Sequence, residues 1–447
     1  MDNRYETVKR WESGARTYAS RFEAVFESGT GVRLRDESGR EVIDCLACAG
    51  ALPLGHNHPE VQDAVQRFLC SGHVMQGLDL TTPAKFEFMQ ELFSVLPDGW
   101  ADKGKIQFCS PSGSDAVEAA MKLVRFATGR SPIIAFHGAY HGMTSGALAA
   151  MGNVSARSGP LARVGDVHFA PFPYRYRCPF GTDGAGTDDL SIRYLSNLFT
   201  DPESGIPKPA AVIVEVVQGE GGCVPASDEW LRELRHITRQ HGIVLVIDEV
   251  QTGFARTGHM FAFQRARIEP DVLVLSKALG GGFPLAAVVY DQALDLWPRG
   301  MHAGTFRGNQ IAMIAGKATM EILRRDRMDE RAAKVGDVLA DGLRQLARQH
   351  PELGDVRGRG LMLGVEIVKP SGSGARAPQD SALAAAIQRA AFENGLLIET
   401  GGRHGAVLRF LPPLILSRSD IGTILDKLDT SVVQAKRNRV SSTSDRR

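Results

Sequence analysis

Short apolar runs alternate with amphipathic segments through the middle of the chain. The runs are Lys105–Cys109, Pro132–Phe136, Ala210–Glu215, Ile243–Ile247 and Asp271–Leu275. Runs of this length without a polar alternation are typical of strands buried on both faces of a sheet. Segments with a helical pattern lie between them, as at Ala116–Thr128 and Asp228–His241. This order predicts an α/β fold in which helices cover both faces of a largely parallel sheet.

The two ends of the chain have a different pattern of predicted strands and helices. Their strand-like and helix-like segments are Gly31–Arg35, Arg40–Asp44, Asp329–Gln349, Gly364–Val368, Ala382–Asn394 and Leu396–Glu399. The first two flank a turn and predict a hairpin. We therefore expect a large domain over residues 76–328, a smaller α+β domain built from residues 1–75 and 329–434, and a disordered tail over residues 435–447.

Composition excludes several classes of protein. The 447 residues include 52 basic and 51 acidic side chains, so the chain lacks the basic excess that nucleic-acid binding requires. The first residues are polar, and no run of about 18 apolar residues occurs, so we expect no secretory signal, no membrane span and a cytoplasmic location. The pair Cys45 and Cys48 has no second pair nearby, and His137 and His141 lie among glycines, so no metal site is predicted.

Candidate chemistry lies where the predicted strands end. The run Ile243–Ile247 is followed by Asp248, and Asp271–Leu275 is followed by Ser276, Lys277 and three glycines at residues 280–282. Ligands of open parallel sheets bind at the carboxyl ends of strands, so the carboxylate and the amine are predicted at one edge. A Gly- and Ser-rich turn over residues 110–115 opens a helix there, where free N–H groups suit a phosphate.

Each of these features also has a purely structural interpretation. Asp248 is suited to capping a helix, Lys277 to facing solvent, and Ser112 with Asp115 to forming a capping box. The combination favours pyridoxal phosphate, because that cofactor needs a Schiff-base lysine, a carboxylate for its ring nitrogen and a phosphate site.

The chain resembles the class III, ω-amino-acid type of pyridoxal-phosphate aminotransferase, of fold type I. The motifs that carry the resemblance are Ser112-Gly-Ser-Asp-Ala116, Phe136-His-Gly-Ala-Tyr-His-Gly142, Glu215-Val-Val-Gln-Gly-Glu-Gly-Gly222, Asp248-Glu-Val-Gln-Thr-Gly253, Ser276-Lys-Ala-Leu-Gly-Gly-Gly282 and Gly304-Thr-Phe-Arg-Gly-Asn309. It covers roughly residues 15–430 and implies a mostly parallel seven-stranded sheet between helices.

Within the family, the chain is most similar to the diaminobutyrate–2-oxoglutarate aminotransferases. The finer resemblance rests on the segments Cys45–Val61, Leu78–Pro83, Tyr176–Gly181 and Gly401–Pro413. It implies that the enzyme transfers an amino group between glutamate and aspartate 4-semialdehyde. The products are 2-oxoglutarate and 2,4-diaminobutyrate.

The resemblance also implies roles for individual residues. Lys277 would form the internal aldimine and then act as the catalytic base, and Asp248 would pair with the pyridinium nitrogen. The remaining residues expected to bind the cofactor are Gly113, Ser114, Tyr140, His141, Glu215, Gln251 and Thr305. Thr305 would reach the cofactor of a second subunit, which implies a homodimer with its active sites at the interface.

Two further residues are expected to bind substrate. The resemblance implies that Arg409 binds the α-carboxylate of glutamate or 2-oxoglutarate, and that Glu220 pairs with Arg409 when the other substrate is bound. A salt bridge that never opens is the structural alternative. Val216 and Gln310 stand where prolines are common in the family, which weakens the transfer of substrate preference.

Other functions remain open at this point. The same scaffold would serve an aminotransferase for ornithine, lysine, 4-aminobutyrate or β-alanine, or a pyridoxal-phosphate mutase or decarboxylase. A Rossmann-like oxidoreductase is disfavoured, because no G-x-G-x-x-G motif follows a predicted strand with an acidic residue about 20 positions later. A scaffold without activity is disfavoured by the presence of both Lys277 and Asp248.

Overall fold

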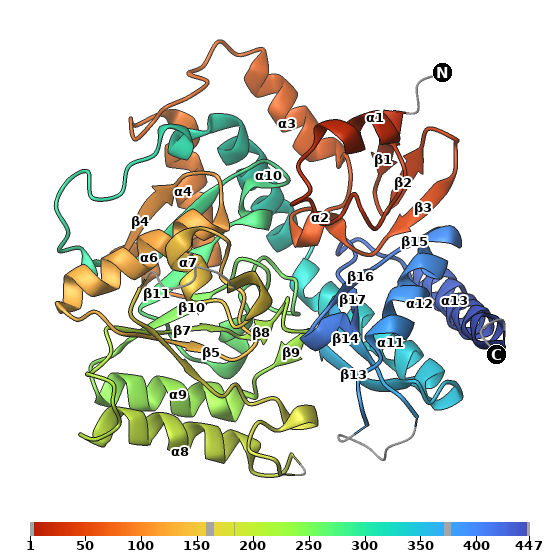
Figure 1. Cartoon of the computed structure of the whole chain (residues 1–447). Helices are drawn as coiled ribbons and strands as arrows, with labels where there is room; N and C mark the ends of the chain where they lie inside the picture. Colours follow the sequence, from red (N-terminus) through yellow and green to blue (C-terminus); the bar gives the residue numbers. More distant parts are fainter. Residues whose placement is uncertain (1–3, 158–164, 183, 371–376, 445–447) are drawn as a thin grey trace.

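The computed structural model describes residues 4–157, 165–182, 184–370 and 377–444 (Figure 1). Its helices are α1 Arg4–Trp11, α2 Ala47–Gly50, α3 Pro59–Leu69, α4 Pro83–Val95, α5 Trp100–Lys103, α6 Gly113–Thr128, α7 Ser145–Ala149, α8 Thr187–Thr200, α9 Asp228–Gln240, α10 Gln310–Arg325, α11 Met328–Gln349, α12 Ser381–Glu393 and α13 Arg418–Ser444. Within these residues, no helix combines the length and the apolar character needed to cross a bilayer.

A seven-stranded sheet forms the centre of the larger part of the chain. Its strands, in spatial order, are β4 Gly104–Cys109, β12 Ala286–Asp291, β11 Val272–Leu275, β10 Val244–Asp248, β7 Ala211–Glu215, β5 Ile133–Phe136 and β6 Val167–Ala170. The strands β11, β10, β7, β5 and β6 are parallel to one another, whereas β12 is antiparallel to β11 and to β4. The predicted α/β class is therefore confirmed.

The five apolar runs form strands, each within one residue of its predicted ends. Successive side chains of a strand point to opposite faces of the sheet, and both faces are covered here. On β10, Leu245 and Ile247 pack in one apolar cluster with Trp230 of α9, while Val244 and Val246 pack in another with Val117 of α6. Burial on both faces explains why these strands have no polar alternation.

Strands from the two ends of the chain meet in one sheet. Its spatial order is β1 Phe26–Thr30, β2 Arg33–Asp36, β3 Glu41–Asp44 and β15 Leu396–Leu397, in which β15 is parallel to β3. A second sheet contains β13 Leu353–Arg359, β14 Met362–Ile367, β17 Val407–Phe410 and β16 Glu399–Gly401, in that order. A short hairpin pairs β8 Val217–Gln218 with β9 Val224–Pro225. Figure 1 shows the first and last parts of the chain, red and blue, gathered beside the central sheet.

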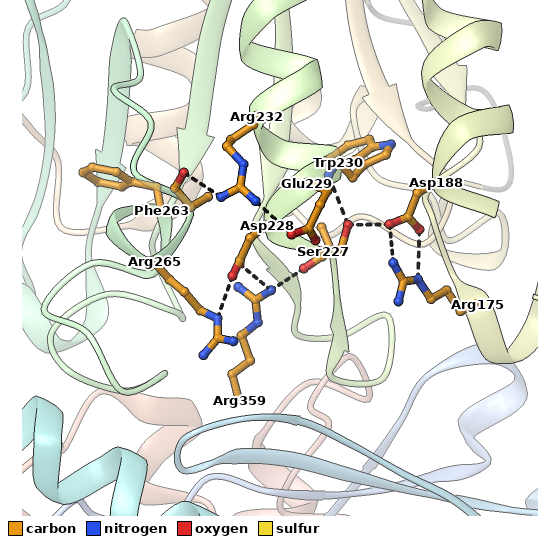
Figure 2. A network of polar contacts seen from close by, with 12 residues as sticks. Arg175, Asp188, Ser227, Asp228, Glu229, Trp230, Arg232, Phe263, Arg265 and Arg359 are labelled. Atoms are coloured by element: carbon orange, nitrogen blue, oxygen red, sulfur yellow. Dashed lines mark hydrogen bonds and ion pairs between the residues drawn. The ribbon is translucent and has the colours of Figure 1, made fainter. Parts of the chain in front are cut away.

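A polar network joins the central part of the chain to the sheet that contains β13 (Figure 2). Asp228, in the first turn of α9, accepts a hydrogen bond of 3.0 Å from Arg265 and forms an ion pair of 3.0 Å with Arg359 of β13. Ser227 caps α9 by accepting from the Trp230 N–H at 3.0 Å. An acidic side chain near a helix N-terminus is stabilised by the helix dipole. The position of β13 relative to the large sheet is thus supported by charge as well as by packing.

The end of the chain differs from the sequence prediction. Helix α13 continues to Ser444, so the disordered tail predicted from residue 435 is wrong as far as this residue. Ala435 is buried, Lys436 forms an ion pair of 2.8 Å with Glu352, and Arg439 forms one of 2.5 Å with Asp380. These contacts join residues that are far apart in the chain. The polar composition of residues 435–447 alone does not predict such contacts. The boundaries at residues 75 and 328 remain a prediction.

We predict that a chain ending at residue 434 is less stable than a chain ending at residue 444. The shorter chain loses two partly exposed ion pairs and the packing of Ala435, which together are worth about 1–2 kcal/mol. Urea unfolding of the two truncated proteins and the full chain measures this difference. Equal stability of all three proteins would show that the last turns of α13 contribute nothing.

Candidate active site

Asp248 and Lys277 come from neighbouring parallel strands. Asp248 is the last residue of β10 and lies opposite Val274 of β11, and Lys277 follows the end of β11 by two residues. Lys277 has a φ of 46°, in the left-handed region that residues with a side chain rarely adopt. Ser276 anchors the turn by donating from Oγ to the Leu285 carbonyl at 2.9 Å. The carboxylate and the amine are thus brought to one edge of the sheet, as the strand-end argument predicted.

The Asp248 carboxylate is buried and paired with a histidine. His141 Nδ1 donates to Asp248 Oδ2 at 2.7 Å, and the Val250 N–H donates to Oδ1 at 3.0 Å. Burial lowers the pKa of His141, but the hydrogen bond and the charge of Asp248 outweigh burial and raise it. Nε2 of His141 is buried without a hydrogen-bond partner in the described structure. The hydrogen bond from His141 therefore stabilises the negative charge of the Asp248 carboxylate.

Burial and several neighbouring charges act on the side-chain amine of Lys277. Burial is the largest influence on its amine and lowers the pKa, while the charges of Glu220 and Asp248 act in the opposite direction. The net effect is a pKa below the usual value for lysine. An amine of this kind loses its proton more readily, which suits a nucleophile or a base.

The predicted phosphate site is the turn between β4 and α6. The Ser112 side chain caps the helix by accepting from the Ser114 N–H at 3.2 Å, and the Ser110 N–H donates to Asp115 at 2.7 Å. The Met143 N–H donates to Ser114 Oγ at 3.1 Å. A Cβ added at Gly113 would lie 3.0 Å from Val250, so glycine permits a close approach of backbone there. The positive end of the helix dipole at this turn suits an anion.

Glu215 connects the sheet to the Tyr140 loop. The Tyr140 N–H donates to Glu215 Oε1 and the Gly219 N–H donates to Oε2, both at 2.9 Å. Burial raises the pKa of Glu215 to about 7 despite these two hydrogen bonds. Tyr140 is itself partly exposed. The carboxyl group therefore fixes the backbone of the loop whose next residue, His141, holds Asp248.

Arg409 is fully buried and its guanidinium binds two carboxylates and an amide. Nη1 donates to Glu220 at 2.7 Å and to Glu399 at 2.9 Å, and Nη2 donates to Gln251 Oε1 at 2.8 Å. Burial would lower the pKa of Arg409, but Glu220 and Glu399 raise it above its usual value. The predicted pairing of Arg409 with Glu220 is thus observed in the structure, while any switching of the pair stays a prediction.

Glu399 was not identified from the sequence. It lies directly opposite Arg409 in the antiparallel pair of β16 and β17. Glu399 and Arg409 carry opposite charges and stand ten positions apart, with a Gly-rich turn between their strands. This spacing would have predicted the pair if the segment had been interpreted as a hairpin. Gln251 was expected to contact the cofactor, and here its Nε2 also donates to the Ala49 carbonyl at 3.2 Å.

Thr305 lies on the surface beside the predicted phosphate site. It begins a short 3₁₀ turn and is exposed. A Cβ at the preceding Gly304 would lie 2.3 Å from Ser110 Oγ, so this segment contacts the turn that opens α6. Whether Thr305 acts on its own subunit or on another stays a prediction.

One group of residues has the composition of a metal site. Cys109, Asp115 and His302 place one possible ligand atom each within 4.8 Å of one another. Asp115 Oδ2 already accepts from the Ser110 N–H and lies 3.1 Å from His302 Nε2. Burial raises the pKa of the Cys109 thiol, and metal ligation needs a thiolate. We therefore assign no metal here.

The residues fit pyridoxal phosphate. A lysine of lowered pKa, a buried carboxylate and the N-terminus of a sixteen-residue helix lie around one sheet edge. Gly113 lets the turn at the helix terminus pack closely against Val250, and the unpartnered His141 Nε2 shows that the Asp248 pair is not saturated by protein atoms.

Comparisons with known proteins give a consistent result. A family model described as class-III aminotransferase matches residues 14–432. The chain is 53% identical over 423 residues to a diaminobutyrate–2-oxoglutarate aminotransferase of Rhizobium meliloti, covering 93% of this chain and 89% of the relative. It is 45% identical over 428 residues to one of Haemophilus influenzae, covering 95% and 93% of the two chains.

Solved structures agree with the sequence comparisons. The PLP-bound amine transaminase of an uncultivated Pseudomonas species has a TM-score of 0.85 and 27% identity, with 95% of this chain and 97% of that chain covered. An (S)-enantioselective omega-transaminase from Thermomicrobium roseum has a TM-score of 0.86 and 26% identity, with 97% and 99% covered.

We predict that Glu215 makes the stability of the cofactor-free protein depend on pH. Its pKa is raised from 4.5 to about 7, so the folded protein holds this proton more tightly than the unfolded chain. The contribution to stability is complete below pH 4.5 and is lost as the pH rises through about 7. The loss amounts to at most about 3 kcal/mol.

The test is urea unfolding of wild type and Glu215→Gln at several pH values between 4.5 and 7. The variant cannot ionise, so its free energy of unfolding should fall less over this range, although one lost hydrogen bond lowers it at every pH. A variant with the same pH profile as wild type would contradict the assignment.

Proposed function

This chain belongs to the class-III aminotransferases, and we propose that it transfers the 4-amino group of L-2,4-diaminobutyrate to 2-oxoglutarate. The products are aspartate 4-semialdehyde and glutamate, and the reaction is reversible. The observation that carries the substrate assignment is the 53% and 45% identity to two relatives named for this reaction. The contact between the buried Arg409 and the half-buried Glu220 supports it, because the two substrates differ in charge near the reacting carbon.

Pyridoxal phosphate is the proposed cofactor, and when bound it supplies an aldehyde that accepts the amino group and a ring that withdraws electrons from the reacting carbon. Gly113 and Ser114 would bind its phosphate through backbone N–H groups. Asp248, supported by His141, would hold a proton on the ring nitrogen. Tyr140 would lie over the ring, with Glu215 holding the backbone of its loop.

Lys277 is the proposed base. Its Nζ would take the proton from the reacting carbon of the substrate and hold it for the later return. Burial lowers the pKa of the amine and so makes a neutral, proton-accepting form accessible. General acid–base catalysis of this kind is typically worth ~10²–10⁴-fold in rate.

Arg409 and Glu220 would serve the two substrates in turn. When the α-carboxylate of glutamate is bound, Arg409 would pair with that carboxylate in place of Glu220. When the diamino acid is bound, its reacting carbon has no carboxylate, and Arg409 would keep the 2.7 Å contact with Glu220 that is present here. Glu399 would remain bound to Arg409 in both states, so the buried guanidinium is never left without a counter-charge.

We predict that cofactor-loaded protein reacts faster with diaminobutyrate than with ornithine or lysine. One additional methylene group typically changes enzyme discrimination ~10- to 200-fold, because it displaces the charged end of the substrate. Loss of the absorption band of the bound cofactor measures the rate, and analysis of the keto product identifies the nitrogen transferred. 4-Aminobutyrate and β-alanine complete the panel.

The control for this experiment is Lys277→Ala, which should not show the absorption of lysine-bound cofactor. Equal rates with ornithine and diaminobutyrate, or transfer of the 2-amino group, would contradict the substrate assignment. A wild-type protein that stays colourless with pyridoxal phosphate would contradict the cofactor assignment.

We also propose that the protein is a homodimer with Thr305 at the interface. Large apolar side chains are exposed on the segments around Thr305, which include the neighbouring Phe306 at 57% and Leu80 at 63%. The Gly77 N–H donates to the Gly308 carbonyl at 3.0 Å, so these two segments are adjacent. Exposed apolar surface of this kind is typical of a subunit interface.

A cytoplasmic location remains a prediction.

We predict that light scattering gives twice the 48.4 kDa mass of one chain. Phe306→Asp should weaken the dimer by about 10- to 100-fold, because it places a charge in apolar contact. Val338→Asp, a change at an exposed apolar residue of α11, is the matched control and should leave the mass unchanged. A wild-type protein that is monomeric would contradict the proposed dimer and its interface.

A further inference from the structure

Arg403 lies beside the proposed substrate site and is assigned no role by the family motifs. It begins the short turn Arg403–Gly405 between β16 and β17, the two strands that carry Glu399 and Arg409. The preceding Gly402 N–H donates to the Glu220 carbonyl at 2.8 Å. The turn is therefore attached to the same backbone that presents the Glu220 side chain to Arg409.

The guanidinium of Arg403 faces the loop that carries Tyr140. A Cβ added at Gly138 would lie 3.3 Å from Arg403 Nη2 and 3.6 Å from Nη1. The same Cβ would lie 2.8 Å from Gln218 Oε1. Arg403 thus extends from the turn between β16 and β17 towards a backbone position two residues before Tyr140.

Arg403 has unused hydrogen-bonding capacity. Its Nη1 is buried without a hydrogen-bond partner, and no carboxylate of the described residues forms an ion pair with it. Its described contact is with the Tyr174 ring, whose centroid lies 4.9 Å from the guanidinium carbon. Stacking on an aromatic ring orients a guanidinium but leaves its N–H donors free for an anion.

The neighbouring acids are already neutralised by other arginines. Glu366 is fully buried and binds Arg177 and Arg357, and Asp355 lies 2.8 Å from Arg357. Among the described residues, this group therefore contains three guanidiniums, counting Arg403, and two carboxylates, which leaves a surplus of one positive charge. Burial lowers the pKa of Arg403, and the surrounding charges do not fully offset this effect. A half-buried surplus cation favours the binding of an anion.

The chemistry of the proposed substrates supplies such an anion at a fixed distance. In 2,4-diaminobutyrate and aspartate 4-semialdehyde, two carbon atoms separate the reacting carbon from the carboxylate carbon. In glutamate and 2-oxoglutarate, two carbon atoms likewise separate the reacting carbon from the distal carboxylate carbon. With their reacting carbons superposed, all four molecules place this carboxylate at the same distance, so a single cationic group suffices for both half-reactions.

We propose that Arg403 is a substrate-binding residue that holds this shared distal carboxylate. The inference rests on the proposed function and adds a second anion site to the one at Arg409. Glutamate would use both arginines, one for each carboxylate. Diaminobutyrate would use Arg403 alone, while Arg409 stays paired with Glu220. Ornithine and lysine would place their carboxylates too far from the reacting carbon.

The test compares two amines that differ only in this carboxylate. 1,3-Diaminopropane is diaminobutyrate without its carboxylate. In wild type, diaminobutyrate should react faster, and Arg403→Met should reduce that preference by about 10- to 100-fold, the range expected for a charge-assisted hydrogen bond. The rate with 1,3-diaminopropane itself should change less than about 3-fold. Arg403→Lys, which keeps the charge but loses the planar fork, should give an intermediate preference.

A binding experiment gives a readout that does not depend on turnover. Glutarate carries two carboxylates at the spacing of 2-oxoglutarate and has no amino group. Titration calorimetry should show about 10- to 100-fold weaker glutarate binding to Arg403→Met than to wild type. Arg265→Met removes an arginine from the network at α9 and should bind glutarate as wild type does. Circular dichroism verifies that each variant is folded.

The outcomes separate the two proposals. If Arg403→Met slows both amines equally and binds glutarate normally, Arg403 is structural and the inference is overturned. If wild type reacts with neither glutamate nor diaminobutyrate, the proposed function fails, while weaker glutarate binding to Arg403→Met would still support the anion site.

Discussion

The buried guanidinium of Arg409 is the interaction on which the arrangement of the site depends. It has no exposed surface, and removing such a charge from water costs several kcal/mol unless it is paired. Glu399 provides a partner from the adjacent strand, whereas Glu220 and Gln251 come from loops at the edge of the large sheet. The sheet that contains β16 and β17 cannot move away from the large sheet without breaking these contacts. The relative placement of the two parts is therefore coupled to the charge balance of the site.

This coupling has a consequence for catalysis. A single carboxylate on Arg409 would make opening of the pair very costly, because the guanidinium would be left buried and unpaired. With Glu399 retained, the displacement of Glu220 by a substrate carboxylate exchanges one anion for another. The proposed alternation between two substrates then requires only a local rearrangement of Glu220. Arg403, attached through Gly402 to the Glu220 backbone, would bind the other end of the substrate from the same element.

The charge of the whole chain is consistent with this design. Basic and acidic side chains number 52 and 51, and the functional charges are few and individually placed. Close backbone contacts help to place them. A Cβ at Gly219 would lie 1.8 Å from Gln251 Oε1, so a larger residue there would disturb the amide that binds Arg409. Glycines in the motif loops thus allow charged groups and backbone to approach each other closely.

The sequence by itself determined the class of fold and the centre of the chemistry. Apolar runs mark strands buried on both faces, because burial is a local property of each segment, and the residues after each strand reach the same edge in any parallel sheet. Lys277 and Asp248 were therefore placed together correctly. Strand β12 is a buried apolar run like the others but was not among the strands predicted, and no burial pattern reveals that it pairs antiparallel to both neighbours.

Only the tertiary structure decided which distant residues become partners. Glu399 with Arg409, His141 with Asp248, and the last turns of α13 with Glu352 and Asp380 join segments that local patterns treat as independent. The surplus charge at Arg403 likewise appears only when three separate segments are brought together and their carboxylates are counted. Pairing of charges depends on distances in space, and these are set by packing of the whole chain rather than by the order of residues along it.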